Sequence, residues 1–204
     1  MKSNKQLVDY LVESGAIQTK KVEQAFLAMD RINFVPEKWR SYAYLDKPIE
    51  ITEGQTISQP TTVAFMLELL GIRKGDYILD IGAGSGWVSC LMGSLTGKSG
   101  KVYAYESNPS MGMFGKKAVY FHCRRNVIYT IGKVQNYWHK INKVDKIHSG
   151  AAFKKIPENL LDKLKINGVL IAPTQKNDIQ KIERTVKGFK KTSYPGFLFV
   201  PFRD

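Results

Sequence analysis

The sequence predicts an α/β fold with a central, mostly parallel seven-stranded sheet, helices on both faces and a helical N-terminal extension. Three observations support this prediction. The apolar run 77–81 enters a glycine-rich turn, strand and helix patterns alternate from there to residue 172, and helix patterns dominate the first part of the chain. Repeated strand–helix–strand units build a parallel sheet that is covered on both faces.

The first part of the chain is expected to be mainly helical. Apolar residues recur at helical spacing in residues 7–12 and again in residues 22–29, the second time after a candidate N-cap at Thr19. Residues 41–57 predict an irregular segment that lies over the domain that follows.

A third helix is expected between Pro60 and Gly71, because proline favours the first turn of a helix and glycine its end. The strands expected after it are 77–81, 101–105, 126–131, 144–149 and 168–172, and the helices are 87–95, 109–120 and 157–165. Residues 178–186 and a clear strand at 197–202 predict an antiparallel pair at the sheet edge.

The length of 204 residues favours one domain with an extension. We expect residues 1–60 to form the extension and to cover substrate and cofactor, and residues 61–204 to form the core with its C-terminal antiparallel strands. No segment is long and apolar enough to span a bilayer, and the first residues lack the apolar core of a signal peptide. A cytoplasmic monomer without a membrane partner is therefore expected.

Cys90 and Cys123 are the only cysteines, and they do not show a paired spacing. The three histidines do not cluster with them in the sequence. We therefore expect free thiols and no structural metal.

The formal net charge of +13 is unevenly distributed. Residues 103–204 contain 19 Lys and Arg against 7 Asp and Glu, whereas residues 1–102 contain 12 against 11. Such a field attracts nucleic acid, acidic peptides or counterions. The basic residues occur as scattered pairs without interleaved aromatic residues, so a nucleic-acid partner stays open but is not favoured.

The turn after residue 81 reads Gly82-Ala83-Gly84-Ser85-Gly86. Glycines let the backbone approach a ligand closely, and the helix that follows directs free N–H groups to the same place. Glu106 lies twenty residues further on, where a carboxylate can accept hydrogen bonds from both hydroxyls of a ribose. Because the spacing is G-x-G-x-G and only one such loop occurs, we expect adenosine rather than NAD.

Six short motifs occur along the chain: Phe34-Val35-Pro36, the G-Q-T-I-S-Q-P run 54–60, the run 79–86, Ala151-Ala152, the run 164–168 and Phe199-Val200-Pro201. In this order and spacing they resemble the protein-L-isoaspartate O-methyltransferase family. The resemblance implies a class I methyltransferase (Rossmann-like) fold and S-adenosylmethionine as the methyl donor, with S-adenosylhomocysteine as product. It also implies that the acceptor is the α-carboxylate of isoaspartyl residues in damaged proteins or peptides, so that the activity serves protein repair.

The resemblance, carried over position by position, also implies roles for individual residues. It makes Ser58 the hydroxyl at the methyl-transfer centre. The implied cofactor-binding residues are Thr56, Ile57, Gly82, Ala83, Gly84, Ser85, Gly86, Glu106, Gly132 and Lys133, and the implied substrate-binding residues are Thr61, Val200 and Pro201.

The sequence departs from the family's pattern at three positions. Thr61 stands where the family commonly has His, Lys133 where it has Asp near the adenine amino group, and Phe202 where it has Leu. A charged lysine cannot accept a hydrogen bond from an adenine amine. Either Gln135 or a backbone carbonyl accepts the hydrogen bond from the adenine amine, or adenine binds in a different position from that in the family. Thr61 bears on the choice of substrate more than on methyl transfer.

A carboxylate acceptor fits a chain without an obvious catalytic His or Cys–His pair. With a reference pKa of about 4 it is ionised at neutral pH, so no general base is required. Asp80 is expected either to bond the turn's own N–H groups or to contact the donor, and His148 to be a core residue. Two alternatives stay open: an RNA acceptor on the same fold, and a cofactor-binding module without repair activity.

Overall fold

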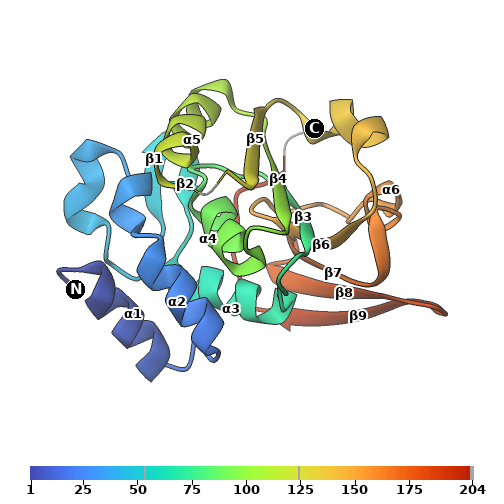
Figure 1. The fold of residues 1–204 in the computed structure, drawn as a ribbon, viewed down its shortest axis with the longest axis horizontal. Helices are drawn as coiled ribbons and strands as arrows, with labels where there is room; N and C mark the ends of the chain where they lie inside the picture. Colours follow the sequence, from blue (N-terminus) through green and yellow to red (C-terminus); the bar gives the residue numbers. More distant parts are fainter. Residues whose placement is uncertain (53, 124, 203–204) are drawn as a thin grey trace.

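The computed structural model describes residues 1–52, 54–123 and 125–202. It contains a seven-stranded sheet in the order β5-β4-β3-β6-β7-β8-β9 (Figure 1). The strands are β3 Tyr77–Ile81, β4 Lys101–Glu106, β5 Val127–Ile131, β6 Val144–Ser149, β7 Leu164–Thr174, β8 Asp178–Thr185 and β9 Gly188–Pro195. Pairing is parallel from β5 to β7 and antiparallel from β7 to β9, which confirms the mostly parallel sheet.

Helices cover both faces of this sheet. They are α1 Asn4–Glu13, α2 Lys20–Ala28, α3 Pro60–Leu70, α4 Trp87–Thr96, α5 Pro109–His122 and α6 Glu158–Leu161, with 3-10 helices η1 Arg31–Phe34, η2 Glu37–Tyr42 and η3 Val134–Lys140. Because neighbouring residues of a strand point to opposite faces, Ile78 belongs to the apolar cluster that includes residues of α1 to α5, whereas Leu79 belongs to the cluster that includes residues of η3 and α6. Figure 1 shows α1 and α2 together at one side and the β8–β9 hairpin extending away on the other.

Local signals explain where the N-terminal helices begin and end. The Ser3 side chain accepts a hydrogen bond from the Gln6 N–H and so caps α1. Thr19 precedes α2 as predicted, but its hydroxyl donates to the Glu68 carboxylate on α3. Gly71 ends α3 in the left-handed conformation, with φ of 59°. These contacts join the helical extension to α3.

Two expectations for local structure were wrong. Residues 41–57 are not wholly irregular, because β1 (Ile49–Thr52) and β2 (Gln55–Ile57) form an antiparallel hairpin. The expected helix 157–165 is only α6, since Leu164 already pairs with Val144 as the start of β7. Leu160, Leu161 and Leu164 are all buried, so burial alone could not distinguish the two structures.

The expected strand 197–202 was also wrong, although the antiparallel pair at the sheet edge is present. The edge pair is β8 and β9, and β9 is almost entirely exposed, so its sequence lacks an apolar pattern. In the segment after it, Phe197 stacks on Phe65 at 5.3 Å between ring centroids. Residues 197–202 form a single bridge, between Pro201 and Ala152, in place of a strand.

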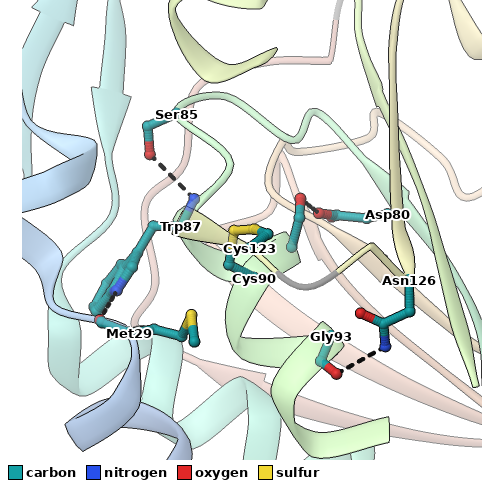
Figure 2. The surroundings of a disulfide bond; sticks show 9 residues. Met29, Asp80, Ser85, Trp87, Cys90, Gly93, Cys123 and Asn126 are labelled. Carbon is teal, nitrogen blue, oxygen red and sulfur yellow. Dashed lines mark hydrogen bonds between the residues drawn. A yellow bond between two sulfur atoms is a disulfide. The ribbon is translucent and has the colours of Figure 1, made fainter. Parts of the chain in front are cut away.

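The expectation of free thiols was wrong as well. Cys90 on α4 and Cys123 at the end of α5 form a disulfide, with Cα atoms 5.2 Å apart (Figure 2). The sequence did not indicate the pair because 33 residues separate the two cysteines and only the packing of α4 against α5 brings them together. Within the described ranges, no helix has the length and apolar character that crossing a membrane requires.

Candidate active site

Two neighbouring cavities lie at the carboxyl ends of the parallel strands. The larger has a volume of about 350 Å³ and the smaller about 40 Å³. Thr56, Gly82, Gly84 and Gly150 line both of them. The strand order changes direction at β3, which lies between β4 and β6, and open α/β sheets bind ligands at such a point.

The glycine turn between β3 and α4 forms the floor of both cavities. The N–H groups of Gly82 and Ala83 donate to the Tyr105 carbonyl at 2.9 and 3.0 Å, which ties the turn to β4. Gly86 has a φ of 81°, and a Cβ there would lie 2.5 Å from a methyl group of Val119. The turn therefore requires glycine at this position, both for its backbone conformation and for the close approach of α5.

Helix α5 packs closely against the glycine turn. A Cβ at Gly115 would overlap the Gly84 carbonyl oxygen, so the helix can pack this closely only with glycine. The Tyr129 hydroxyl donates to the same carbonyl at 2.6 Å. Burial, followed by the charges of Glu106 and Asp80, raises the pKa of Tyr129, so its hydroxyl stays a donor at neutral pH. The glycines that made α5 a weak prediction are thus part of the site.

Glu106 ends β4 and lines the larger cavity. One carboxylate oxygen accepts from the Gly84 N–H at 2.9 Å and the other from the Asn108 N–H at 2.8 Å. Burial raises the pKa of Glu106, while these backbone N–H groups oppose the shift. Each oxygen keeps a second lone pair, so the carboxylate can still accept hydrogen bonds from a ligand in the cavity.

Ser58 lies in the turn that precedes α3 and lines the smaller cavity together with Ile57. The turn is held from below by Arg31, which is fully buried and donates to the Ser58 carbonyl at 3.0 Å. Thr56, on β2, lines both cavities. The structure therefore brings the predicted catalytic serine next to the glycine turn, although about two dozen residues separate them in the sequence.

Asp80 and His148 lie side by side in the wall of the smaller cavity. Asp80 is fully buried, with one oxygen 2.8 Å from His148 Nδ1 and the other accepting from the Ser89 hydroxyl at 2.5 Å. Neither of the two expected roles for Asp80 describes this arrangement fully, because its partners are side chains of β6 and α4. His148 is a buried residue as expected, but it also faces the candidate site.

The other predicted site residues fall into two groups. The structure brings most of them to the cavities: Gly132, Lys133, Val200 and Pro201 line the larger one, and Ala83 and Ser85 the smaller one. Gln135 also lines the larger cavity, beside Lys133. Gly86 and Thr61 line neither cavity. The Thr61 hydroxyl donates to Asp46 at 2.7 Å, and its N–H donates to the same carboxylate at 2.9 Å.

Sequence reasoning missed several lining residues, among them Gln55, Asn108, Ala151 and Phe199. Ala151 and Asn108 follow the ends of β6 and β4, so the rule that ligands bind at carboxyl ends of parallel strands could have identified them. Gln55 and Phe199 adjoin Thr56 and Val200 in two of the motifs that carry the resemblance, so the resemblance could have identified them. Among the described residues, no three His, Cys, Asp or Glu side chains gather as metal ligands would.

Comparison with known proteins agrees with this geometry. The model of the family described as protein-L-isoaspartate(D-aspartate) O-methyltransferase matches residues 2–203. A protein-L-isoaspartate O-methyltransferase from Ignicoccus hospitalis is 34% identical over 201 residues, covering 97% of this chain and 95% of the relative. The one from Petrotoga mobilis is 35% identical over 205 residues, covering 98% and 95%.

Solved structures share the fold along the whole chain. A Plasmodium falciparum structure described as a protein-L-isoaspartate O-methyltransferase, in complex with S-adenosyl-L-homocysteine, superimposes with a TM-score of 0.87 at 26% identity, covering 100% of this chain and 99% of that one. A second structure of that name has a TM-score of 0.89 at 22% identity, covering 98% of this chain and 66% of that one. On the match of the family model and of the curated relatives, this chain belongs to the protein-L-isoaspartate O-methyltransferase family.

Proposed function

We propose that the two cavities form one active site, in which the methyl group of S-adenosylmethionine is transferred to the α-carboxylate of L-isoaspartyl residues in damaged proteins or peptides. Family membership makes S-adenosylmethionine-dependent carboxyl methylation the activity of this chain. The observation that carries the assignment of the site is the shared wall: Thr56, Gly82, Gly84 and Gly150 border both cavities. A donor in the larger cavity and an acceptor at the smaller one would meet there.

The residues of the larger cavity fit an adenosyl cofactor. S-adenosylmethionine supplies, when bound, a methyl group on a positively charged sulfur. The second lone pairs of the Glu106 carboxylate suit the two ribose hydroxyls, and the glycine turn leaves room for the methionine part. Gly132, Lys133 and Gln135 line the same cavity, and we assign the adenine to that end. A hydrogen bond to the adenine amine would come from Gln135 or a backbone carbonyl, because a charged lysine cannot accept one.

The smaller cavity would orient the acceptor. The Ser58 hydroxyl can donate to one carboxylate oxygen and leave the other free to attack. The acceptor is already ionised at neutral pH, so the chain has only to align it, and alignment of this kind contributes up to about 7–11 kcal/mol. Val200 and Pro201 would hold the peptide at the mouth of the larger cavity.

The division of the chain into two parts is also a proposal. Residues 1–60 would cover the site and residues 61–204 would form the core that carries the cofactor. Thr56 and Ser58 support this division, because both come from the first part and line the smaller cavity.

The test is methyl labelling of matched peptides. The protein is incubated with labelled S-adenosylmethionine and two peptides that differ only in an isoaspartyl or an aspartyl linkage. We expect label in the isoaspartyl peptide alone, released by mild base as expected for a carboxyl ester. Equal labelling of both peptides, or labelling of added RNA in place of either, would contradict the proposed acceptor.

A further inference from the structure

A third cavity, of about 260 Å³, lies outside the active site. Its wall contains three tyrosines and three lysines, namely Tyr77, Tyr103, Tyr105, Lys140, Lys143 and Lys165. We call it the tyrosine–lysine cavity. Its volume approaches the range of small-molecule sites, and aromatic walls with a few convergent polar groups are characteristic of such sites.

The three tyrosines share one face of the sheet. Tyr103 and Tyr105 alternate along β4, and Leu79 of β3 pairs with Tyr103 two residues after Tyr77, so the three side chains point to the same side. Tyr105 is only 9% exposed, yet its hydroxyl makes no hydrogen bond within the part of the chain that the structure describes. Its hydroxyl is not among the fully buried polar atoms that lack a partner, so it is accessible and can donate a hydrogen bond to a ligand in the cavity.

The lysines give the cavity a positive charge. Lys165 is held over the Tyr77 ring, 5.4 Å from its centre, and pairs with Asp145 at 2.8 Å. Lys140 and Lys143, at the end of η3 and just after it, form no ion pair with any described residue. Because Asp145 already bonds Lys165 and the Tyr77 N–H, the cavity keeps uncompensated positive charge at Lys140 and Lys143.

We propose that the tyrosine–lysine cavity binds a small molecule in which a flat aromatic ring carries an anionic group such as a phosphate. The ring would pack against the tyrosines, and the anion would accept hydrogen bonds from the Tyr105 hydroxyl and from Lys140 or Lys143. Burial, together with Tyr137 and Tyr103, raises the pKa of Tyr105, which keeps the hydroxyl protonated and able to donate.

Tyr105 lines both the tyrosine–lysine cavity and the larger cavity of the active site. Its carbonyl accepts the hydrogen bonds of the glycine turn, and its ring lies 5.2 Å from that of Tyr137. We expect the tyrosine–lysine cavity to stay open to a ligand while the cofactor is bound. The proposal does not depend on the methyl acceptor.

Calorimetry on protein saturated with S-adenosylhomocysteine tests the site, because the adenosyl pocket is then filled. The probe is guanosine 5′-monophosphate, and guanosine and inorganic phosphate serve as its two halves. We expect one molecule to bind per chain, at least about tenfold more tightly than either half. No saturable binding, or guanosine binding as tightly as the nucleotide, would overturn the proposal. A single-stranded hexanucleotide that binds more tightly than the mononucleotide would overturn the small-molecule occupant.

Matched variants locate the binding. Lys143→Gln and Tyr103→Leu are each expected to weaken guanosine 5′-monophosphate at least about fivefold. Their controls are Lys187→Gln, between β8 and β9, and Tyr120→Leu on α5, where the side chain is 81% exposed. Unchanged affinity for S-adenosylhomocysteine shows that each variant is folded. Equal effects of the cavity variants and the controls would refute the location.

Discussion

The Nη2 atom of Arg31 donates a hydrogen bond of 3.0 Å to the carbonyl oxygen of Ser58. The same guanidinium donates to the Ala43 carbonyl at 2.7 Å and lies 5.2 Å from the centre of the Trp87 ring, the first residue of α4. Burial lowers the pKa of Arg31 to about 9, so the side chain is still charged at neutral pH. One buried cation thus connects the Ser58 turn to the helix that follows the glycine turn.

Replacing Arg31 with lysine is expected to lower kcat more than the affinity for S-adenosylhomocysteine. Lysine keeps the charge but cannot donate to several carbonyls at once, and a misplacement of about 1 Å at a reacting centre can reduce the rate by about 100-fold. Steady-state kinetics and calorimetry separate the two effects. Arg40→Lys, on exposed η2, is the control, and a fall in cofactor affinity without a fall in kcat would contradict this role.

Ser58→Ala tests the hydroxyl at the smaller cavity. A hydrogen bond to a charged group is worth about 1.5–3 kcal/mol, so kcat should fall by about 10- to 100-fold. S-adenosylhomocysteine should bind normally, because the backbone of the turn is unchanged. Ser41→Ala, at an exposed position of η2, should behave as the unaltered protein does. Gln59, not Ser58, is the N-cap residue of α3. If the Ser58 hydroxyl serves only the structure of the turn, its replacement will lower the unfolding temperature and leave kcat unchanged.

The raised pKa of Glu106 predicts a pH dependence of cofactor binding. Ribose hydroxyls donate to the ionised carboxylate, so affinity for S-adenosylhomocysteine should fall as the pH drops through the raised pKa. Because that pKa lies above the ordinary value of 4.5, the fall should begin at a higher pH than for an ordinary glutamate. Glu106→Gln should bind more weakly and without this titration. Calorimetry between pH 4.5 and 8 measures both, and a parallel pH profile in the variant would show that another group is responsible.

The effect of Glu106 on the stability of the ligand-free protein has the opposite sign. Protonation removes the cost of burying the charge, so this group favours folding below its unfolded pKa, and that contribution is lost as the pH rises through the raised folded value. In Glu106→Gln this contribution is absent. Denaturant unfolding of both proteins across the same pH range should therefore show the variant gaining relative stability as the pH rises.

Gly115→Ala should disturb the glycine turn from behind. The added methyl group would overlap the Gly84 carbonyl and lie 2.5 Å from the Tyr129 hydroxyl. Overpacking costs about 1–3 kcal/mol, against about 1 kcal/mol gained from helix propensity. We expect S-adenosylhomocysteine to bind about tenfold more weakly. Lys117→Ala, exposed on the same helix, is the control, and equal affinities in the two variants would contradict the packing argument.

The disulfide predicts a stability that depends on redox conditions. Closing a loop over a separation of 33 residues stabilises the folded chain by about 3–4 kcal/mol in the chain-entropy model. Thermal unfolding should therefore occur at lower temperature in reductant. The double variant Cys90→Ser, Cys123→Ser should unfold at this lower temperature both with and without reductant. Identical curves for the unaltered protein in both conditions would show that the two thiols are not joined.

The cofactor half of the candidate site was predictable from local patterns. A glycine turn after an apolar strand, and Glu106 at the end of the next strand, stand at positions that the α/β fold itself brings together. Gly115 shows the limit, because a glycine in a helix lowers the propensity on which the prediction depends. Glycine is required at this position because any side chain would overlap the Gly84 carbonyl, which belongs to the turn between β3 and α4.

The sequence by itself determined the parallel core, the glycine turn and the family, because periodicity and short motifs are local properties of the chain. Only the tertiary structure decided that Thr56, Gly150 and Val200 border common space, that Cys90 meets Cys123, and that β9 rather than residues 197–202 completes the sheet. These features depend on contacts between distant segments. Burial of apolar surface is non-directional, and the partner that each segment finds is therefore set by packing of the whole chain.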